Sequence, residues 1–197
     1  MRDPPSTAVY APHIHPATLP NDPEVDITCI AGNAPTHIKR LTCNTLLAHG
    51  FGTDPTAFGY HVGRAIRFVE MSIERNIDRA DRLEATTIAE VTVTKHMLNG
   101  AGMLHGGCVT YLIDICCSTP LIVLGLFLST NGIGVTQAMN VLFHAPSPLD
   151  SQLRIASTSI SLGGRVMTSR CEIIDKGTGR PVASAFLNKM QPRQAKL

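Results

Sequence analysis

From Ala65 onward, the spacing of hydrophobic residues is typical of β-strands. Apolar residues recur at Ile66, Phe68, Met71 and Ile73, and alternation resumes around Ile88, after a charged turn at 76–82. Further alternating segments lie at about 134–145, 152–162, 165–175 and 181–190. Because alternation places one face of a strand in a core, we predict strands at all of these positions. Glycines at 163–164 and the segment 175–179 supply hairpin turns, so the last three strands should run antiparallel.

A continuous apolar run from Cys108 to Leu128 separates the two sets of strands. The run is long enough to cross a bilayer. However, it contains Asp114 and Pro120 and has no basic flank, so we predict a buried central helix and no membrane span. A membrane anchor is the alternative, and purification without detergent would exclude it. Pro120 is expected to kink or shorten the helix.

One long buried helix and five or six antiparallel strands have one economical packing, in which a curved sheet wraps around the helix. The predicted class is therefore α+β, with this domain at 65–190. Seven of the thirteen prolines lie within residues 1–35, which predicts an extension that is extended or disordered. Residues 36–64 form an appendage with a short amphipathic helix from Thr36 to about His49, and 191–197 form a tail.

Composition narrows the class of protein. The net charge is +2 and only 16% of residues are charged, which does not indicate a nucleic-acid binder. The six cysteines include no C-x-x-C pair, so we expect reduced thiols in an intracellular protein. The acidic N-terminal region does not resemble a secretory signal or a transit peptide. The final tripeptide Ala195-Lys196-Leu197 is a conservative variant of the Ser-Lys-Leu peroxisomal signal, so the expected location is peroxisomal or cytoplasmic.

The segment 99–107 and Asp114 carry the candidate chemistry. Glycines at a helix start leave backbone N–H groups uncovered, and these donors can stabilise an oxyanion, although they can also simply permit close packing. A carboxylate in an apolar helix indicates a functional site or a structural buried acid. Gly106 and Asp114 are separated by about 12 Å along a helix. If the two groups cooperate on one carbonyl, they should come from different copies of the chain, which predicts a site at a homodimer interface.

The sequence Leu104-His105-Gly106-Gly107, followed by six residues and Asp114, resembles the signature of the hotdog-fold acyl-CoA thioesterases, in particular the PaaI-like branch. The resemblance covers about residues 65–190 and continues through motifs at 134–136, 139–140, 145–146, 163–165 and 179–183. It implies a hotdog fold, hydrolysis of an acyl-CoA to a free acid and coenzyme A, no metal or other cofactor, and a dimer or tetramer.

The resemblance also assigns roles to individual residues. Asp114 matches the catalytic base or nucleophile, and the Gly106 backbone N–H matches the oxyanion donor. Asn99 would orient water or substrate, His105 would support the oxyanion loop, and Thr136 would lie near the water. The expected substrate-binding residues are Lys95, Gly107, Phe143, His144, Ala145, Pro146, Ser161, Leu162, Gly163, Gly164, Arg165 and Val166. Arg165, Lys95, Lys176 and Arg180 are candidates for pairing with the phosphates of coenzyme A.

The sequence also leaves other interpretations to consider. The same fold could serve as a non-catalytic acyl-CoA or lipid binding module. His13 and His15 have the spacing of a metal-binding pair, but no third ligand is evident, so no metal site is predicted. The adjacent Cys116 and Cys117 could be redox-sensitive, although we interpret them as small buried apolar residues.

Overall fold

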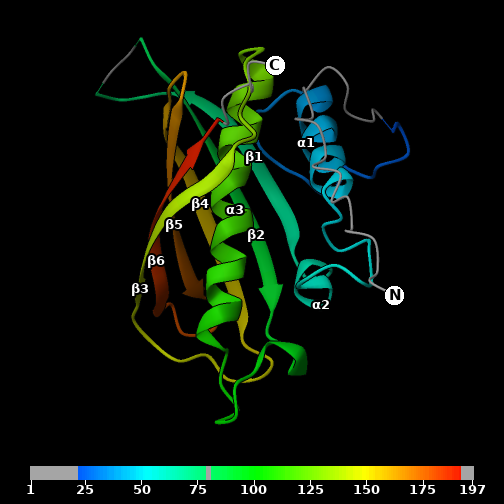
Figure 1. Cartoon of the computed structure of the whole chain (residues 1–197), viewed down its shortest axis with the longest axis vertical. Coiled ribbons are helices and arrows are strands. Elements are labelled where there is room, and N and C mark those ends of the chain that lie inside the picture. Colours follow the sequence, from blue (N-terminus) through cyan, green and yellow to red (C-terminus); the bar gives the residue numbers. More distant parts are fainter. Residues whose placement is uncertain (1–21, 79–80, 192–197) are drawn as a thin grey trace, which may run out of the picture.

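The computed structural model describes residues 22–78 and 81–191, which form a curved antiparallel sheet wrapped around one long helix (Figure 1). The spatial order of the strands is β1-β2-β4-β5-β6-β3, and all neighbouring pairs are antiparallel. The predicted α+β hotdog architecture is confirmed. The strands are β1 (Arg67–Arg75), β2 (Leu83–Thr92), β3 (Val135–Phe143), β4 (Gln152–Leu162), β5 (Val166–Asp175) and β6 (Pro181–Met190). The helices are α1 (Thr36–Ala48), α2 (Tyr60–Gly63), the 3-10 helix η2 (Lys95–Met97) and α3 (Gly106–Phe127).

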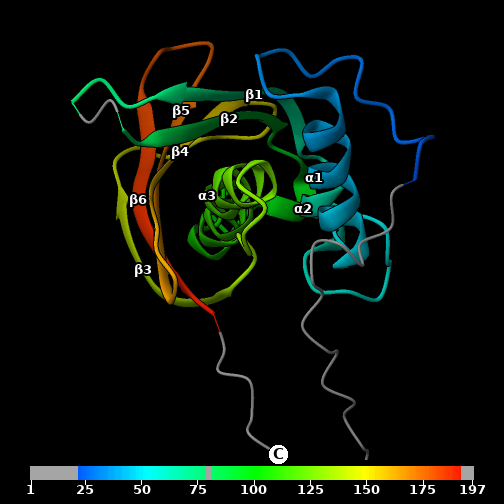
Figure 2. The same cartoon turned by 90° about the horizontal axis from the view of Figure 1, so that it is seen from above.

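The core lies between α3 and the concave face of the sheet (Figure 2). Burial alternates along β4 and β5, where Leu153, Ile155 and Ile173 are fully buried and their neighbours are more exposed. This period of two reflects opposite directions of successive side chains in a strand. The second half of α3 is buried on nearly every side, so its continuous apolar sequence is explained by the surrounding sheet.

Pro120 lies within α3 without ending it. The helix continues for 22 residues through this position, so the expected shortening does not occur. Proline cannot donate a hydrogen bond to the carbonyl four residues earlier. Pro120 is itself buried, and we attribute the continuity of the helix to packing against the sheet. Length and hydropathy would allow α3 to span a membrane, but 72% of its apolar window is buried within the fold, as in the core helix of a domain.

Residues 22–35 differ from the expected extension because they pack on the edge of the sheet. The N–H of Ala31 donates to Val69 O at 2.8 Å, and the N–H of Met71 donates to Ala31 O at 3.0 Å. Ile30 and Ala34 are buried in the core. A proline-rich segment without hydrophobic periodicity can still contain isolated apolar residues that are buried in the core, and backbone groups that hydrogen-bond to a strand. Periodicity alone does not detect these contacts. Residues 1–21, with His13 and His15, and the tripeptide 195–197 lie outside the described residues.

The two edges of the sheet therefore differ in whether another segment of the chain covers them. The edge at β1 is covered by residues 30–34, and Asn33 adds side-chain hydrogen bonds to the backbone of Ile73. In the described part of the chain, β3 at the other edge pairs only with β6. Val135, Leu142 and Phe143 on β3 are more than half exposed. The β3 edge is thus open to a further strand.

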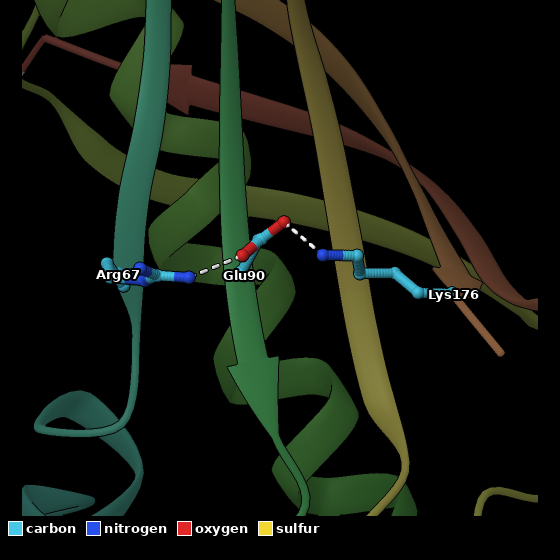
Figure 3. A network of polar contacts seen from close by, with 3 residues as sticks. All are labelled: Arg67, Glu90 and Lys176. Atoms are coloured by element: carbon cyan, nitrogen blue, oxygen red, sulfur yellow. Dashed lines mark hydrogen bonds and ion pairs between the residues drawn. The ribbon is translucent and has the colours of Figure 1, made fainter. Parts of the chain in front are cut away.

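The outer face of the sheet carries a small ion-pair network (Figure 3). Glu90 on β2 lies between Arg67 on β1, at 2.6 Å, and Lys176 after β5, at 2.5 Å. The hydrogen bond from Lys176 is the largest cause that lowers the pKa of Glu90, and Arg67 adds to it. Lys176, one of the cations considered for phosphate binding, is therefore paired within the chain.

Candidate active site

The start of α3 is held by a short turn that fixes Asn99. The side-chain oxygen of Asn99 accepts hydrogen bonds from the N–H groups of Ala101, at 2.9 Å, and Met103, at 3.2 Å. Leu104 is held in turn by a bond from its N–H to Ser147 O. The backbone that enters the helix is therefore fixed on both sides, and the NH₂ group of Asn99 has no partner among the described residues.

His105 caps α3 and leaves one N–H group free. Its Nδ1 accepts a hydrogen bond from the N–H of Gly107 at 2.8 Å, which places the ring proton on Nε2 when the imidazole is neutral. In the described structure, no acceptor bonds to the N–H of Gly106. An uncovered N–H at a helix N-terminus, where the helix dipole is positive, is a suitable donor to an oxyanion.

Residues distant in the sequence meet beside this free N–H. A cavity of about 400 Å³ brings Asn99 and Gly106 together with the segment that follows β3. The ring of Phe143 would lie 3.6 Å from a Cβ added at Gly106. The predicted residues Phe143 to Pro146 thus line the same cavity as Gly106. The cavity is lined by Asn99, Met103, Leu104, Gly106, Val109, Phe143, His144, Ala145, Pro146, Ser147 and Val182.

Asp114 lies elsewhere on α3 and contacts both β3 and β6. Its Oδ1 accepts a hydrogen bond from the Thr136 hydroxyl at 2.6 Å, while Oδ2 has no partner among the described residues. Lys189 is the register partner of Thr136, and its Nζ donates to Ser118 Oγ at 2.9 Å. The Ser118 hydroxyl in turn donates to the carbonyl of Asp114 at 2.5 Å. Thr136, which the resemblance places near the water, thus lies within hydrogen-bond distance of the Asp114 carboxylate.

Lys189 places a cationic group beside the carboxylate. Burial lowers the pKa of Lys189, and the charge of Asp114 partly opposes this effect. An ammonium near a carboxylate attracts it electrostatically, so Lys189 is part of the charged environment of Asp114. Sequence reasoning did not select Lys189. The alternation of β6 and its pairing with β3 were the signals that could have placed it next to Thr136.

Asp114 and Gly106 do not share a cavity within one chain. Asp114 lines a second cavity of about 410 Å³, and none of the residues that line it also lines the cavity at Gly106. This separation matches the distance expected between the two positions along a helix. One chain thus carries the carboxylate and the free N–H in two separate cavities.

The predicted binding residues at 161–166 lie far from Gly106 in the same chain. Leu162 lies near Leu124 and Leu128 at the C-terminal end of α3, and the N–H of Gln191 donates to Arg165 O. Gly106 is at the opposite end of the helix. Arg165 and Lys95 are exposed, as phosphate-binding side chains must be.

Ser147 was not predicted from the sequence. Its buried hydroxyl lines the cavity at Gly106 and has no hydrogen-bond partner among the described residues.

The cysteines differ strongly in exposure. Cys116 and Cys117 are buried, as interpreted, and burial is the largest cause that raises the pKa of the Cys116 thiol. Burial also raises the pKa of Cys43 to about 11, whereas Cys29 is exposed. No group of three or more metal-ligating side chains occurs within residues 22–78 and 81–191.

We expect a thiol-specific reagent such as Ellman's reagent to modify Cys29 rapidly in the native protein, because reaction requires an accessible thiolate. Cys116 and Cys117 should react only after unfolding in guanidinium. Cys29→Ser should remove the fast phase of the reaction followed by absorbance. Rapid native modification of Cys116 or Cys117, located by peptide mass spectrometry, would contradict this assignment.

Comparison with known proteins agrees with this geometry. Residues 101–182 match the model of the thioesterase superfamily. The mouse acyl-coenzyme A thioesterase THEM4 is 26% identical over 116 residues, which cover 58% of this chain and 47% of that protein. The chain therefore aligns with about half the length of this curated relative.

Two solved structures share the fold. Mouse thioesterase superfamily member 2 superposes with a TM-score of 0.60 at 20% identity, covering 80% of this chain and 99% of that one. The Escherichia coli PaaI protein superposes with a TM-score of 0.54 at 19% identity, covering 77% of this chain and 94% of that one. With its curved sheet, central helix and glycine-started α3, the chain has the hotdog fold, and residues 101–182 match the thioesterase superfamily.

Proposed function

We propose that this chain hydrolyses acyl-CoA thioesters to a free acid and coenzyme A, at sites shared between two copies. The observation that carries this proposal is the pair of half-sites: an Asp114 carboxylate with one free oxygen, and a helix N-terminus with a free Gly106 N–H. A thioesterase needs a group to activate water and a donor to stabilise the oxyanion. The match of residues 101–182 to the thioesterase superfamily supports the reaction class.

The open β3 edge provides a way to join the half-sites. Gly106 lies beside Phe143 at the end of β3, and Asp114 bonds to Thr136 near its start. If two β3 strands pair antiparallel about a twofold axis near Met139 and Asn140, the end of one strand lies opposite the start of the other. Each Asp114 then faces the Gly106 of the partner subunit, and two equivalent sites form. A dimer, or a tetramer built from such dimers, would satisfy this arrangement.

In the proposed reaction, Asp114 accepts a proton from water as the water oxygen bonds to the thioester carbon. The carbonyl oxygen becomes an oxyanion that accepts the Gly106 N–H of the partner subunit. The C–S bond then breaks, and the sulfur leaves with the proton held by Asp114. Thr136 orients the carboxylate, and the positive charge of Lys189 attracts it. Direct attack by Asp114, followed by hydrolysis of the anhydride, uses the same groups.

The first test is release of free thiol from a panel of acyl-CoAs, with the acid product identified by mass spectrometry. Turnover that rises with protein concentration and yields both products would support the enzyme. Tight binding of acyl-CoA without thiol release would instead favour the non-catalytic binding module.

The Lys95 and Arg165 side chains are proposed to pair with the phosphates of coenzyme A. Substitution of either residue should therefore raise KM more than it lowers kcat.

We expect Lys189→Met to lower kcat about tenfold, which corresponds to about 1.4 kcal/mol. Because burial lowers the pKa of Lys189, the wild-type rate should fall at alkaline pH, at a pKa below the usual lysine range, as the ammonium loses its proton. This alkaline limb should be absent in Lys189→Met. Lys176→Met removes a lysine on the outer face and should leave the pH profile unchanged. Identical profiles for wild type and Lys189→Met would refute the role of Lys189.

A further inference from the structure

The cavity that contains Asp114 has a wall contributed by the segment before the sheet. Residues of α3 form one side, including Tyr111, Ile115 and Ile122. The opposite side comes from residues 45–58, with Leu46, Phe51 and Phe58 among them. These residues precede the part of the chain that matches the superfamily model, which begins at residue 101. The wall thus comes from the segment before β1 and not from the sheet that surrounds α3.

The wall is docked onto α3 close to Asp114. Phe58 and Phe51 contact Tyr111, with ring centroids at 5.5 and 6.4 Å, and the Tyr111 hydroxyl donates to Phe58 O at 3.2 Å. Gly59 has φ of +73° and lies against the Tyr111 ring, where an added Cβ would be 2.4 Å from Cζ. Only glycine allows this approach. Tyr111 lies three residues before Asp114, on the same face of the helix.

The cavity combines a few polar side chains with an otherwise apolar lining. The polar side chains are those of Thr45, His49, Asp114, Ser118 and Lys189, and most of the others are aliphatic or aromatic. A volume of about 410 Å³ lies within the range of small-molecule sites. Phe58 is 86% exposed, although it stands over the cavity. An apolar group placed in this cavity would cover Phe58 and remove its ring from water.

The geometry points to residues 45–58 as the wall of an acyl-binding pocket that selects an apolar acyl group, either an aliphatic chain of medium length or an aromatic ring. This inference rests on the proposed function, because the thioester carbon must lie at Asp114 for the acyl group to enter the cavity. Phe51, Ala57 and Phe58 are the specificity-determining residues. Short acyl groups such as acetyl reach the carboxylate but not the wall.

The test compares kcat/KM for octanoyl-CoA and acetyl-CoA. Wild type should favour octanoyl-CoA, and Phe51→Ala or Phe58→Ala should reduce the ratio on the order of tenfold, because lost apolar contacts act on the longer chain. Ala57→Trp should fill the cavity and lower the rate for octanoyl-CoA while the rate for acetyl-CoA is retained. Phe186→Ala removes a ring that is more than half exposed on the outer face of β6, away from the cavity, and serves as the control.

A binding experiment separates this inference from the proposed function. The affinities of octanoyl-CoA and acetyl-CoA are measured by calorimetry in the Asp114→Asn background, with and without Phe58→Ala. A preference for octanoyl-CoA that Phe58→Ala reduces would support the acyl pocket even if wild type releases no thiol. The acyl pocket would be refuted if Phe58→Ala and Ala57→Trp left the preference for octanoyl-CoA over acetyl-CoA unchanged, both in kcat/KM for hydrolysis and in binding affinity. Both positions lie in a surface loop, so these variants do not depend on repacking of the core.

Discussion

Asp114→Asn should lower kcat for acyl-CoA hydrolysis about 10³-fold, within the range that a positioned general base contributes. The amide has the shape of the carboxylate and can still accept the Thr136 hydrogen bond through its oxygen, but it cannot take a proton from water. Because Asp114 is only partly buried and Oδ2 has no protein partner, the fold should tolerate the change. The measurement is thiol release under saturating substrate, with the thermal midpoint recorded for each protein.

Asp81→Asn is the matched control, since it makes the same chemical change in the exposed turn between β1 and β2. It should leave kcat unchanged. An unaltered kcat in Asp114→Asn would exclude the residue as base and as nucleophile. A thermal midpoint that falls together with the rate would instead identify Asp114 as a structural acid, which is the alternative that the sequence left open.

Gly106→Pro should lower kcat about 10²- to 10³-fold, the usual effect of removing one oxyanion donor. Proline has no N–H, and it is favoured at the first position of a helix. His105 has φ of −70° and ψ of 135°, which is compatible with a following proline. Gly106→Ala keeps the N–H and places its Cβ 3.6 Å from Phe143, an ordinary contact. The alanine variant should therefore retain most of the activity, and an equal loss in both variants would show that shape rather than the N–H is responsible.

Mixing these two inactive variants tests whether the site is shared. In a dimer of one Asp114→Asn chain and one Gly106→Pro chain, a site formed across the interface would carry either both substitutions or neither. Refolding the two chains together should then restore about a quarter of the wild-type rate, because half of the dimers are mixed and half of their sites are intact. Activity that stays at the level of the separate variants would place both groups in the same chain.

Much of this fold could be predicted because its elements have distinct hydrophobic periods. The strand predicted at 152–162 coincides with β4, and the helix that begins at Gly106 ends at Phe127. The continuity of α3 through Pro120 could not be predicted, since it depends on packing against a sheet assembled from both sides of the chain. Likewise, Ile30 and Ala34 have no local period, and only the covered edge of β1 explains their burial.

The residues of the candidate site that could be predicted are those whose type is unusual for their position in the sequence. Asp114 stands out in an apolar helix, and Gly106 stands at a helix start. Lys189 does not stand out in the sequence, because a lysine near the end of a strand is common. Its role depends on the β3–β6 register, which pairs it with Thr136, and on the approach of Ser118 from α3. Such residues are specified by tertiary contacts rather than by spacing.

The contact of Ala31 with β1 has a consequence for how the sheet can grow. A sheet with two free edges can add copies at both sides without end, which leads to fibrous aggregates. Here residues 30–34 already occupy the hydrogen-bonding positions along much of the β1 edge, so strand addition is possible only at β3. Pairing of two β3 strands then leaves no edge exposed for a third copy. If the proposed pairing through β3 occurs, a segment that contributes nothing to the half-sites would thus favour a closed assembly over open-ended polymerisation.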